Sequence, residues 1–224
     1  MVRRTFALVH GAWHDGTCWA PLARILEARG HAVVTPTLPC DDVAKGFDDY
    51  AAVVVDALAE RDPAFVVGHS LGSETIGLVA ESIPVRMIVY LCPRLGLVTG
   101  ADDGPSPIFR DGVPWPPIDE HGRSVWPREV AMSWMYAGLG EALASELASR
   151  LRPQASPPRQ PRPLSPDVRR AVLYTSGDQF FRPEREVWVA RHVLGVEPLE
   201  LPGGHFPMFE HPERLADVLE TLAA

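Results

Sequence analysis

The sequence predicts an α/β fold with a mostly parallel sheet of about six strands and helices on both of its faces. Short apolar segments that are typical of buried strands alternate with segments of helical periodicity, first up to residue 93 and again after residue 166. Residues 94–166 break this alternation. A chain of 224 residues is long enough for one ordinary domain with a sizeable core.

The elements expected before the break are strands that end near a glycine or proline and helices with one apolar face. The expected strands are Thr5–His10, Ala32–Leu38, Ala64–Gly68 and Val85–Cys92. The expected helices run from Leu22 to Gly30, from Gly46 to Leu58 and over Ser73–Glu81. Because strands and helices alternate, consecutive strands are expected to be parallel.

The break is expected to be an insert over the sheet rather than part of it. Residues 94–166 contain no convincing strand pattern, but Arg128–Ala137 and Glu141–Leu151 have helical spacing. Six prolines between Pro153 and Pro166 predict an irregular return segment. We therefore expect a core of residues 1–93 and 167–224, with residues 94–166 forming a small helical cap.

The alternation resumes after the insert and supplies the remaining elements. Strands are expected over Ala171–Ser176 and Val196–Leu201, separated by a helix over Glu184–Leu194. Pro212 is well placed to open a last helix, which is apolar on the face that carries Leu215, Val218, Leu219 and Leu222.

Composition excludes several function classes. The net charge of −8 and the scattered arginines argue against a nucleic-acid partner. No apolar run approaches the roughly 18 residues of a membrane span, and no signal peptide is evident, so we expect a cytoplasmic protein without a membrane partner. Cys18, Cys40 and Cys92 are widely spaced, which favours free thiols and predicts neither a metal nor a cofactor.

The clearest chemical motif is Gly68-His69-Ser70-Leu71-Gly72, between an expected strand and an expected helix. A serine on such a sharp turn presents its hydroxyl above the sheet, and glycines two residues away on either side leave room for the turn. Ser70 is therefore the candidate nucleophile, and a serine nucleophile requires a neighbouring base.

His205 and Asp178 are the candidate base and orienting acid. His205 follows the last expected strand through Gly203-Gly204, and Asp178 follows the preceding strand through Gly177. Because parallel strands end at one edge of the sheet, both side chains are expected near Ser70. The chain order serine, aspartate, histidine is the order expected for this arrangement.

The segment His10-Gly11-Ala12-Trp13 follows the first strand and is the candidate oxyanion loop. We expect the backbone N–H groups of Ala12 and Leu71 to form an oxyanion hole, the second being the residue after the nucleophile. His10 and His69 are then expected to hold loops by hydrogen bonds, because a second base is not required.

Four segments of the chain resemble the α/β-hydrolase branch of plant methyl esterases, salicylate-binding esterases, hydroxynitrile lyases and their bacterial relatives. The segments are His10–Trp19, Gly68–Gly72, Thr175–Asp178 and Gly203–Met208. The resemblance implies the α/β-hydrolase fold and a triad of Ser70, Asp178 and His205. The chain departs from the family at Asp15 and Thr17, and Phe206 stands where the lyases have a lysine.

Aromatic and sulfur-containing residues near the triad and in the insert predict an apolar substrate cleft. The candidate substrate-binding residues are Trp13, Trp126, Trp134, Phe180, Phe206 and Met208. We expect a serine hydrolase that cleaves a small hydrophobic ester or lactone through an acyl-enzyme. A small-molecule sensor on the same fold and, less favoured, a non-hydrolytic lyase or cyclase stay open, as does a homodimer.

Overall fold

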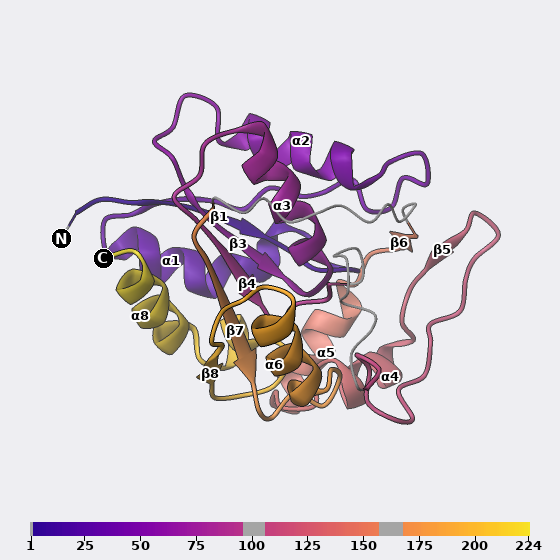
Figure 1. The fold of residues 1–224 in the computed structure, drawn as a ribbon. Coiled ribbons are helices and arrows are strands. Elements are labelled where there is room, and N and C mark those ends of the chain that lie inside the picture. The colour runs from indigo at the N-terminus through magenta and orange to yellow at the C-terminus, as the bar shows by residue number, and fades with distance from the viewer. Residues whose placement is uncertain (1, 96–105, 157–167) are drawn as a thin grey trace.

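The computed structural model describes residues 2–95, 106–156 and 168–224. Six of the described strands form one parallel sheet in the order β2-β1-β3-β4-β7-β8, which confirms the predicted fold class (Figure 1). The strands are β1 (Thr5–Val9), β2 (Ala32–Val34), β3 (Phe65–His69), β4 (Met87–Leu91), β7 (Arg170–Thr175) and β8 (Leu199–Leu201).

Helices cover both faces of this sheet, as parallel crossovers require. Figure 1 shows α1 and α8 together on one side and α2 with α3 on the other. The helices of the core are α1 (Ala20–Ala28), α2 (Phe47–Ala57), α3 (Ser73–Ser82), α6 (Pro183–His192) and α8 (Pro212–Leu222). The chain passes from β1 outward to β2 and then returns to β3 on the other side of β1, so the connections reverse direction there. Such a reversal opens a crevice at the carboxyl ends of the strands.

Two predicted strands are shorter than expected because prolines interrupt them. The expected strand Ala32–Leu38 ends at Val34, two residues before Pro36. The strand expected to begin at Val196 begins only at Leu199, directly after Pro198. Proline has no N–H to donate to a neighbouring strand, so it limits both ladders.

The described part of the insert, residues 106–156, is named the cap segment below. It contains α4 (Arg128–Trp134), α5 (Glu141–Ser149) and a short antiparallel pair of β5 (Arg123–Ser124) and β6 (Gln154–Ala155). The prediction that the insert has no strand is therefore wrong. A two-residue strand is too short to show alternation, and its partner lies far along the chain. The division of the chain into a core and a cap stays a prediction, and the prolines from 157 to 166 lie outside the described residues.

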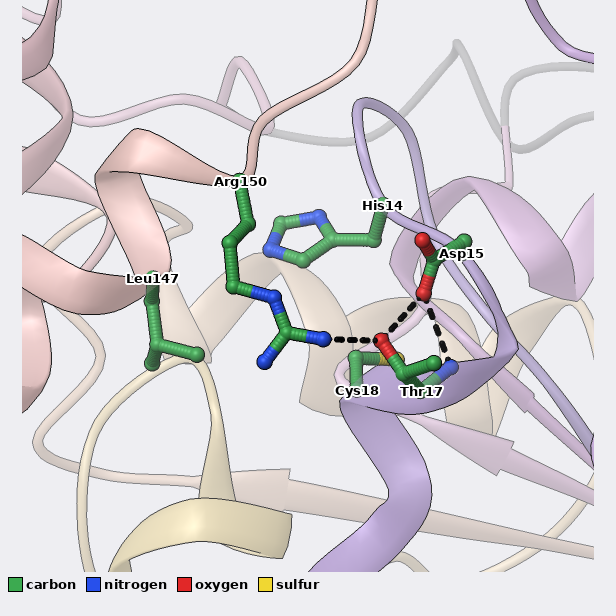
Figure 2. A pocket seen from close by; sticks show the side chains of 6 residues that line it. All are labelled: His14, Asp15, Thr17, Cys18, Leu147 and Arg150. Carbon is green, nitrogen blue, oxygen red and sulfur yellow. Dashed lines mark hydrogen bonds between the residues drawn. The ribbon is translucent and has the colours of Figure 1, made fainter.

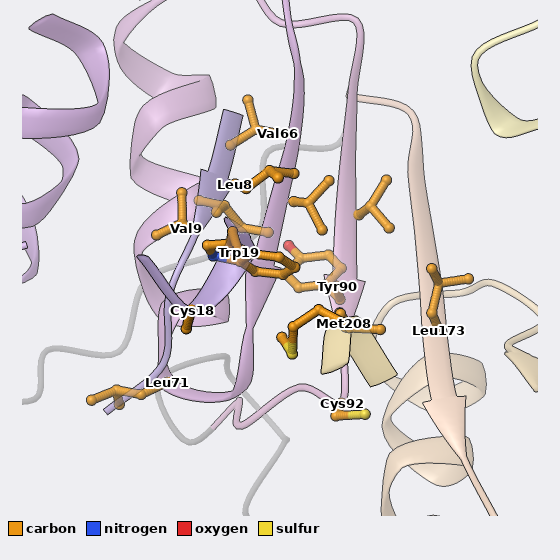
Figure 3. Close-up of a cluster of buried hydrophobic side chains, with 14 of the residues drawn as sticks. Leu8, Val9, Cys18, Trp19, Val66, Leu71, Tyr90, Cys92, Leu173 and Met208 are labelled. Carbon is orange, nitrogen blue, oxygen red and sulfur yellow. The ribbon is translucent and has the colours of Figure 1, made fainter. Parts of the chain in front are cut away.

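The core lies between the sheet and its helices. All residues of β1, β3 and β4 are buried, as expected for a parallel sheet that is covered on both faces. Figure 3 shows Trp19, Tyr90 and Met208 gathered beside these strands. Met208 belongs to α7 (Pro207–Glu210), a short helix that the sequence pattern did not reveal. Within the described ranges, no helix is both long and apolar enough to cross a membrane.

Candidate active site

Ser70 occupies a strained turn between β3 and α3. Its φ is +50°, in the left-handed region that side chains other than glycine rarely adopt. The flanking glycines are required by close contacts. A Cβ at Gly68 would lie 2.8 Å from the carbonyl oxygen of Gly72, and a Cβ at Gly72 would lie 2.5 Å from the carbonyl oxygen of His10. The glycine pattern thus allows the serine turn to pack against the loop after β1.

Asp178 and His205 form a buried, directly bonded pair. The distance from His205 Nδ1 to Asp178 Oδ2 is 2.7 Å, and the two residues are 3% and 0% exposed. The other carboxylate oxygen, Oδ1, accepts from the backbone N–H groups of Phe180 at 2.7 Å and Phe181 at 2.9 Å. A carboxylate held in this way orients the imidazole with its proton on Nδ1, which leaves Nε2 able to accept a proton.

The serine turn and the histidine loop meet through His69. The Nε2–H of His69 donates to the carbonyl oxygen of His205 at 2.8 Å, and the two rings lie 4.8 Å apart. Ser70, the next residue, therefore lies at the same edge of the sheet as the Asp178–His205 pair. Among the described residues, no hydrogen bond joins the hydroxyl of Ser70 to His205. This bond is often long in unliganded enzymes and tightens when substrate binds.

The candidate oxyanion loop is fixed by two buried histidines. His10 donates from Nδ1 to the carbonyl oxygen of Gly11 at 2.8 Å and accepts from the N–H of Leu38 at 2.9 Å. The peptide whose carbonyl belongs to Gly11 carries the N–H of Ala12, so His10 orients that N–H group. His14 donates from Nδ1 to the carbonyl oxygen of Ala12 at 2.7 Å.

Burial keeps His10, His14 and His69 neutral at physiological pH. It lowers the pKa of His10 and of His14 to about 4. Burial also lowers the pKa of His69 well below its ordinary value, and the nearby His205 adds to that effect. Each of these rings can therefore donate a hydrogen bond from one nitrogen while the other carries no proton.

Aromatic rings surround the acid–base pair. The rings of Phe180 and Phe206 both lie 5.1 Å from the ring of His205, and Trp126 packs edge-on against Phe180 and Trp13 at 5.7 Å in each case. Four of the predicted substrate-binding residues, Trp13, Trp126, Phe180 and Phe206, therefore belong to one connected group of rings that includes His205.

The two other predicted substrate-binding residues lie elsewhere. Trp134 lies at the end of α4, where it is partly buried against the core, and Met208 is fully buried within the core.

Two side chains at this site were not predicted from the sequence. The ring of Phe181 lies 4.5 Å from the ring of His205, closer than that of Phe180. The hydroxyl of Tyr136, in the cap segment, lies 2.7 Å from His14 Nε2, and its ring lies 5.1 Å from that of Phe206. The adjacency of Phe181 to Phe180 is a signal that could have found the first residue. Tyr136 is 122 residues from His14, so no local pattern indicates that contact.

A buried thiol and a second buried acid lie near the Asp178–His205 pair. Cys92 Sγ, a carboxylate oxygen of Asp178 and a ring nitrogen of His205 lie within 4.8 Å of one another, a set that could hold a metal ion. Burial raises the pKa of the Cys92 thiol well above its usual range, and both oxygens of Asp178 already accept hydrogen bonds. A metal would have to ionise that thiol and displace the imidazole proton, so these donors fit an acid–base pair better.

The second acid is Glu186 of α6, which is 1% exposed. Neither of its carboxyl oxygens has a hydrogen-bond partner among the described residues. Burial, together with the charge of Asp178, raises the pKa of Glu186 well above its ordinary value. The surroundings of Glu186 therefore favour its neutral form over the carboxylate.

A small pocket lies on the other side of the oxyanion loop. It is lined by His14, Asp15, Thr17, Cys18, Leu147 and Arg150. Figure 2 shows the guanidinium of Arg150 reaching across it to the hydroxyl of Thr17, at 2.8 Å. Its volume of about 20 Å³ is enough for one water molecule. None of the triad residues lines it, so it is a gap between the loop and α5 rather than the substrate cleft.

Comparison with known proteins gives a family match over most of the chain. The model of the "Alpha/beta hydrolase family" matches residues 6–218. Norfluorocurarine synthase 1 from a Strychnos species is 24% identical over 99% of this chain and 96% of its own length. A pyrethroid hydrolase from Sphingobium wenxiniae is 26% identical over 96% of this chain and 86% of its own length.

A shorter match and a solved structure agree with these results. Salicylic acid-binding protein 2 from Nicotiana tabacum is 34% identical over 37% of this chain and 35% of its own length. The crystal structure of a pyrethroid hydrolase superposes with a TM-score of 0.80 at 22% identity, covering 99% of this chain and 98% of the other. That likeness supports the same fold.

Proposed function

Because the chain belongs to the alpha/beta hydrolase family, we propose that it is a serine hydrolase of small hydrophobic carboxylic esters or lactones. The relatives named as a hydrolase and an esterase support the ester hydrolase class. The similarity to salicylic acid-binding protein 2 supports the branch that the motifs indicated. The observation that carries the proposal is the buried Asp178–His205 bond, at the same sheet edge as the strained Ser70 turn.

The proposed reaction passes through an acyl-enzyme. Nε2 of His205 takes the hydroxyl proton of Ser70 as Oγ attacks the ester carbonyl carbon. The N–H groups of Ala12 and Leu71 stabilise the negative oxygen of the tetrahedral intermediate. The intermediate collapses, His205 returns the proton to the departing alcohol, and the acyl group stays on Ser70. Water, activated by the same histidine, then releases the acid.

The surroundings of the pair favour an uncharged, apolar substrate. The rings of Phe180, Phe181 and Phe206 lie around His205, and Trp126 extends this aromatic wall to the cap segment. Such walls bind acyl or aryl groups mainly by burying apolar surface. We further propose that the protein is cytoplasmic and that it acts without a nucleic acid, a membrane or a metal.

Two other functions are each favoured by one relative. The name of salicylic acid-binding protein 2 supports a small-molecule sensor with little turnover. The name of norfluorocurarine synthase supports non-hydrolytic chemistry with the same triad. A cyanide-releasing lyase is disfavoured, because the residue after His205 is Phe206, which carries no cation.

The test is hydrolysis of short p-nitrophenyl esters by wild-type protein and by Ser70→Ala. We expect turnover by the wild type that Ser70→Ala abolishes, and labelling of Ser70 by a fluorophosphonate. Thr75→Ala is a matched control, because it removes a buried hydroxyl without a hydrogen-bond partner among the described residues. Specific ligand binding without turnover would support the sensor, whereas activity that survives in Ser70→Ala would overturn the serine mechanism.

A further inference from the structure

The oxyanion loop contains a second strained residue. Trp13 directly follows Ala12, and its φ is +62°. A bulky side chain rarely adopts this left-handed conformation, because its Cβ crowds the backbone. Such a conformation persists only where the surrounding contacts hold it in place.

The contacts that hold Trp13 come from the cap segment. Its indole Nε1–H donates to the carbonyl oxygen of Ser124 at 3.1 Å and lies 3.2 Å from the Ser124 hydroxyl. Its own carbonyl oxygen accepts from the N–H of Arg152 at 2.9 Å. Ser124 lies in β5, and Arg152 lies between α5 and β6. One residue in β5 and one residue shortly before β6 therefore both bond to the same residue of the loop.

A second tether runs through His14. Its Nδ1–H donates to the carbonyl oxygen of Ala12 at 2.7 Å, and its Nε2 accepts from the hydroxyl of Tyr136 at 2.7 Å. The neutral ring needed for this relay is consistent with the burial that lowers the pKa of His14 to about 4. The carbonyl of Ala12 is thus fixed by a ring that the cap segment holds from its other side.

We propose that the cap segment keeps the oxyanion hole in its working shape, with Trp13, His14 and Tyr136 as positioning residues. This inference rests on the proposed function. The peptide groups on either side of Ala12 are set by His10 and His14. Because the two peptides share the Cα of Ala12, a displacement of the second peptide also displaces the first, which carries the N–H of Ala12. The developing negative oxygen depends on the direction of that donor more strongly than the neutral ester does. The cap therefore acts on the rate of the chemical step and not only on substrate fit.

Tyr136→Phe is the most direct test, because it removes one hydroxyl and keeps the ring that packs against Phe206. We expect kcat for a short p-nitrophenyl ester to fall about tenfold while KM changes less than about twofold. This fall in kcat is smaller than the one that follows removal of a whole oxyanion donor. Inactivation by a fluorophosphonate, whose oxygen would occupy the same hole, should slow in proportion. Tyr174→Phe is the matched control, because it removes a hydroxyl that bonds to Glu200 at the exposed side of the sheet.

Trp13→Phe provides a second variant, which removes the indole donor and keeps an aromatic ring. We expect the same fall in kcat with little change in KM. Unchanged kcat in both variants, or a rise in KM alone, would overturn the positioning role and leave Tyr136 and Trp13 as walls of the cleft. Absence of wild-type turnover together with absence of Ser70 labelling would instead contradict the proposed function, so the two failures are distinguishable.

Discussion

The Asp178–His205 pair and the candidate oxyanion loop are held in different ways. Asp178 is fixed by backbone N–H groups of its own turn, and His205 by a bond from His69 at the end of β3. The loop that carries Ala12 is held by buried histidines and by the distant residues Ser124, Tyr136 and Arg152 of the cap segment. The side-chain bonds of the first half thus come from segments at the edge of the sheet, and Arg110 of the cap segment adds a bond from its Nε to the backbone carbonyl oxygen of Asp178 at 2.6 Å. The second half, in contrast, depends on the cap segment at three residues.

The largest expected effect comes from breaking the half that contains the Asp178–His205 pair. Asp178→Asn keeps the size of the side chain but favours the wrong imidazole tautomer, so kcat should fall about 10⁴-fold. The backbone N–H of Phe180 can still donate to the amide oxygen, so the variant should fold. Ester turnover and a melting curve on the same preparation check both points. A folded variant that keeps more than about a third of wild-type kcat would mean that another acid orients His205.

The second expected effect is a loss of stability in acid that comes from two histidines of the candidate oxyanion loop. The pKa values of His10 and His14 are lowered on folding from 6.5 to about 4. A histidine whose pKa is lowered on folding contributes nothing above its unfolded pKa, and it opposes folding increasingly as pH falls below that value, because the unfolded state then binds more protons. Between pH 7 and pH 5 the free energy of unfolding should therefore decrease by about 2 kcal/mol for each ring. Urea unfolding at the two pH values measures this difference, and equal stabilities would contradict it.

A third prediction concerns the contact between the serine turn and the oxyanion loop. Gly72→Ala would place a Cβ 2.5 Å from the carbonyl oxygen of His10, a backbone atom that cannot move aside cheaply. We expect a loss of about 1–3 kcal/mol in the free energy of unfolding and a large loss of activity.

Gly77→Ala, within the helix α3 that begins directly after Gly72, is the control for that substitution. Nothing lies within 4 Å of the added Cβ, so alanine should leave stability unchanged or raise it by up to about 1 kcal/mol. Thermal melts of both variants test the contrast. Equal effects of the two substitutions would show that helix propensity, not the close approach, governs Gly72.

The smallest effect is expected behind the acid–base pair. Burial and the charge of Asp178 raise the folded pKa of Glu186, so the carboxyl opposes folding increasingly as pH rises above its unfolded value of 4.5. Glu186→Gln keeps the shape and removes this penalty, so the variant should gain stability over wild type at pH 8 more than at pH 5. Melting curves at both values decide the matter, and a stability difference that does not change with pH would exclude a buried, protonated Glu186.

The contrast between the two halves also explains what the sequence could predict. The candidate triad positions follow from local rules, because Gly68, Gly177 and Gly203 mark turns at the ends of apolar strands. The end of β2 at Val34 and the start of β8 at Leu199 differ from the prediction because prolines shorten these two strands. The tethers of the oxyanion loop could not be predicted, because Trp13 and Ser124 are 111 residues apart and the strand that carries Ser124 has two residues. Packing between distant segments, rather than local pattern, determines that half of the site.

The central claim is that Ser70 carries the acyl group during turnover. The most direct measurement is rapid quenching of wild-type protein with a short p-nitrophenyl ester, followed by peptide mass analysis. We predict that the peptide containing Ser70 gains the mass of the acyl group in step with the first release of nitrophenol, and that Ser70→Ala gains none. Steady ester turnover without an adduct on Ser70, or with the adduct on another residue, would contradict the account.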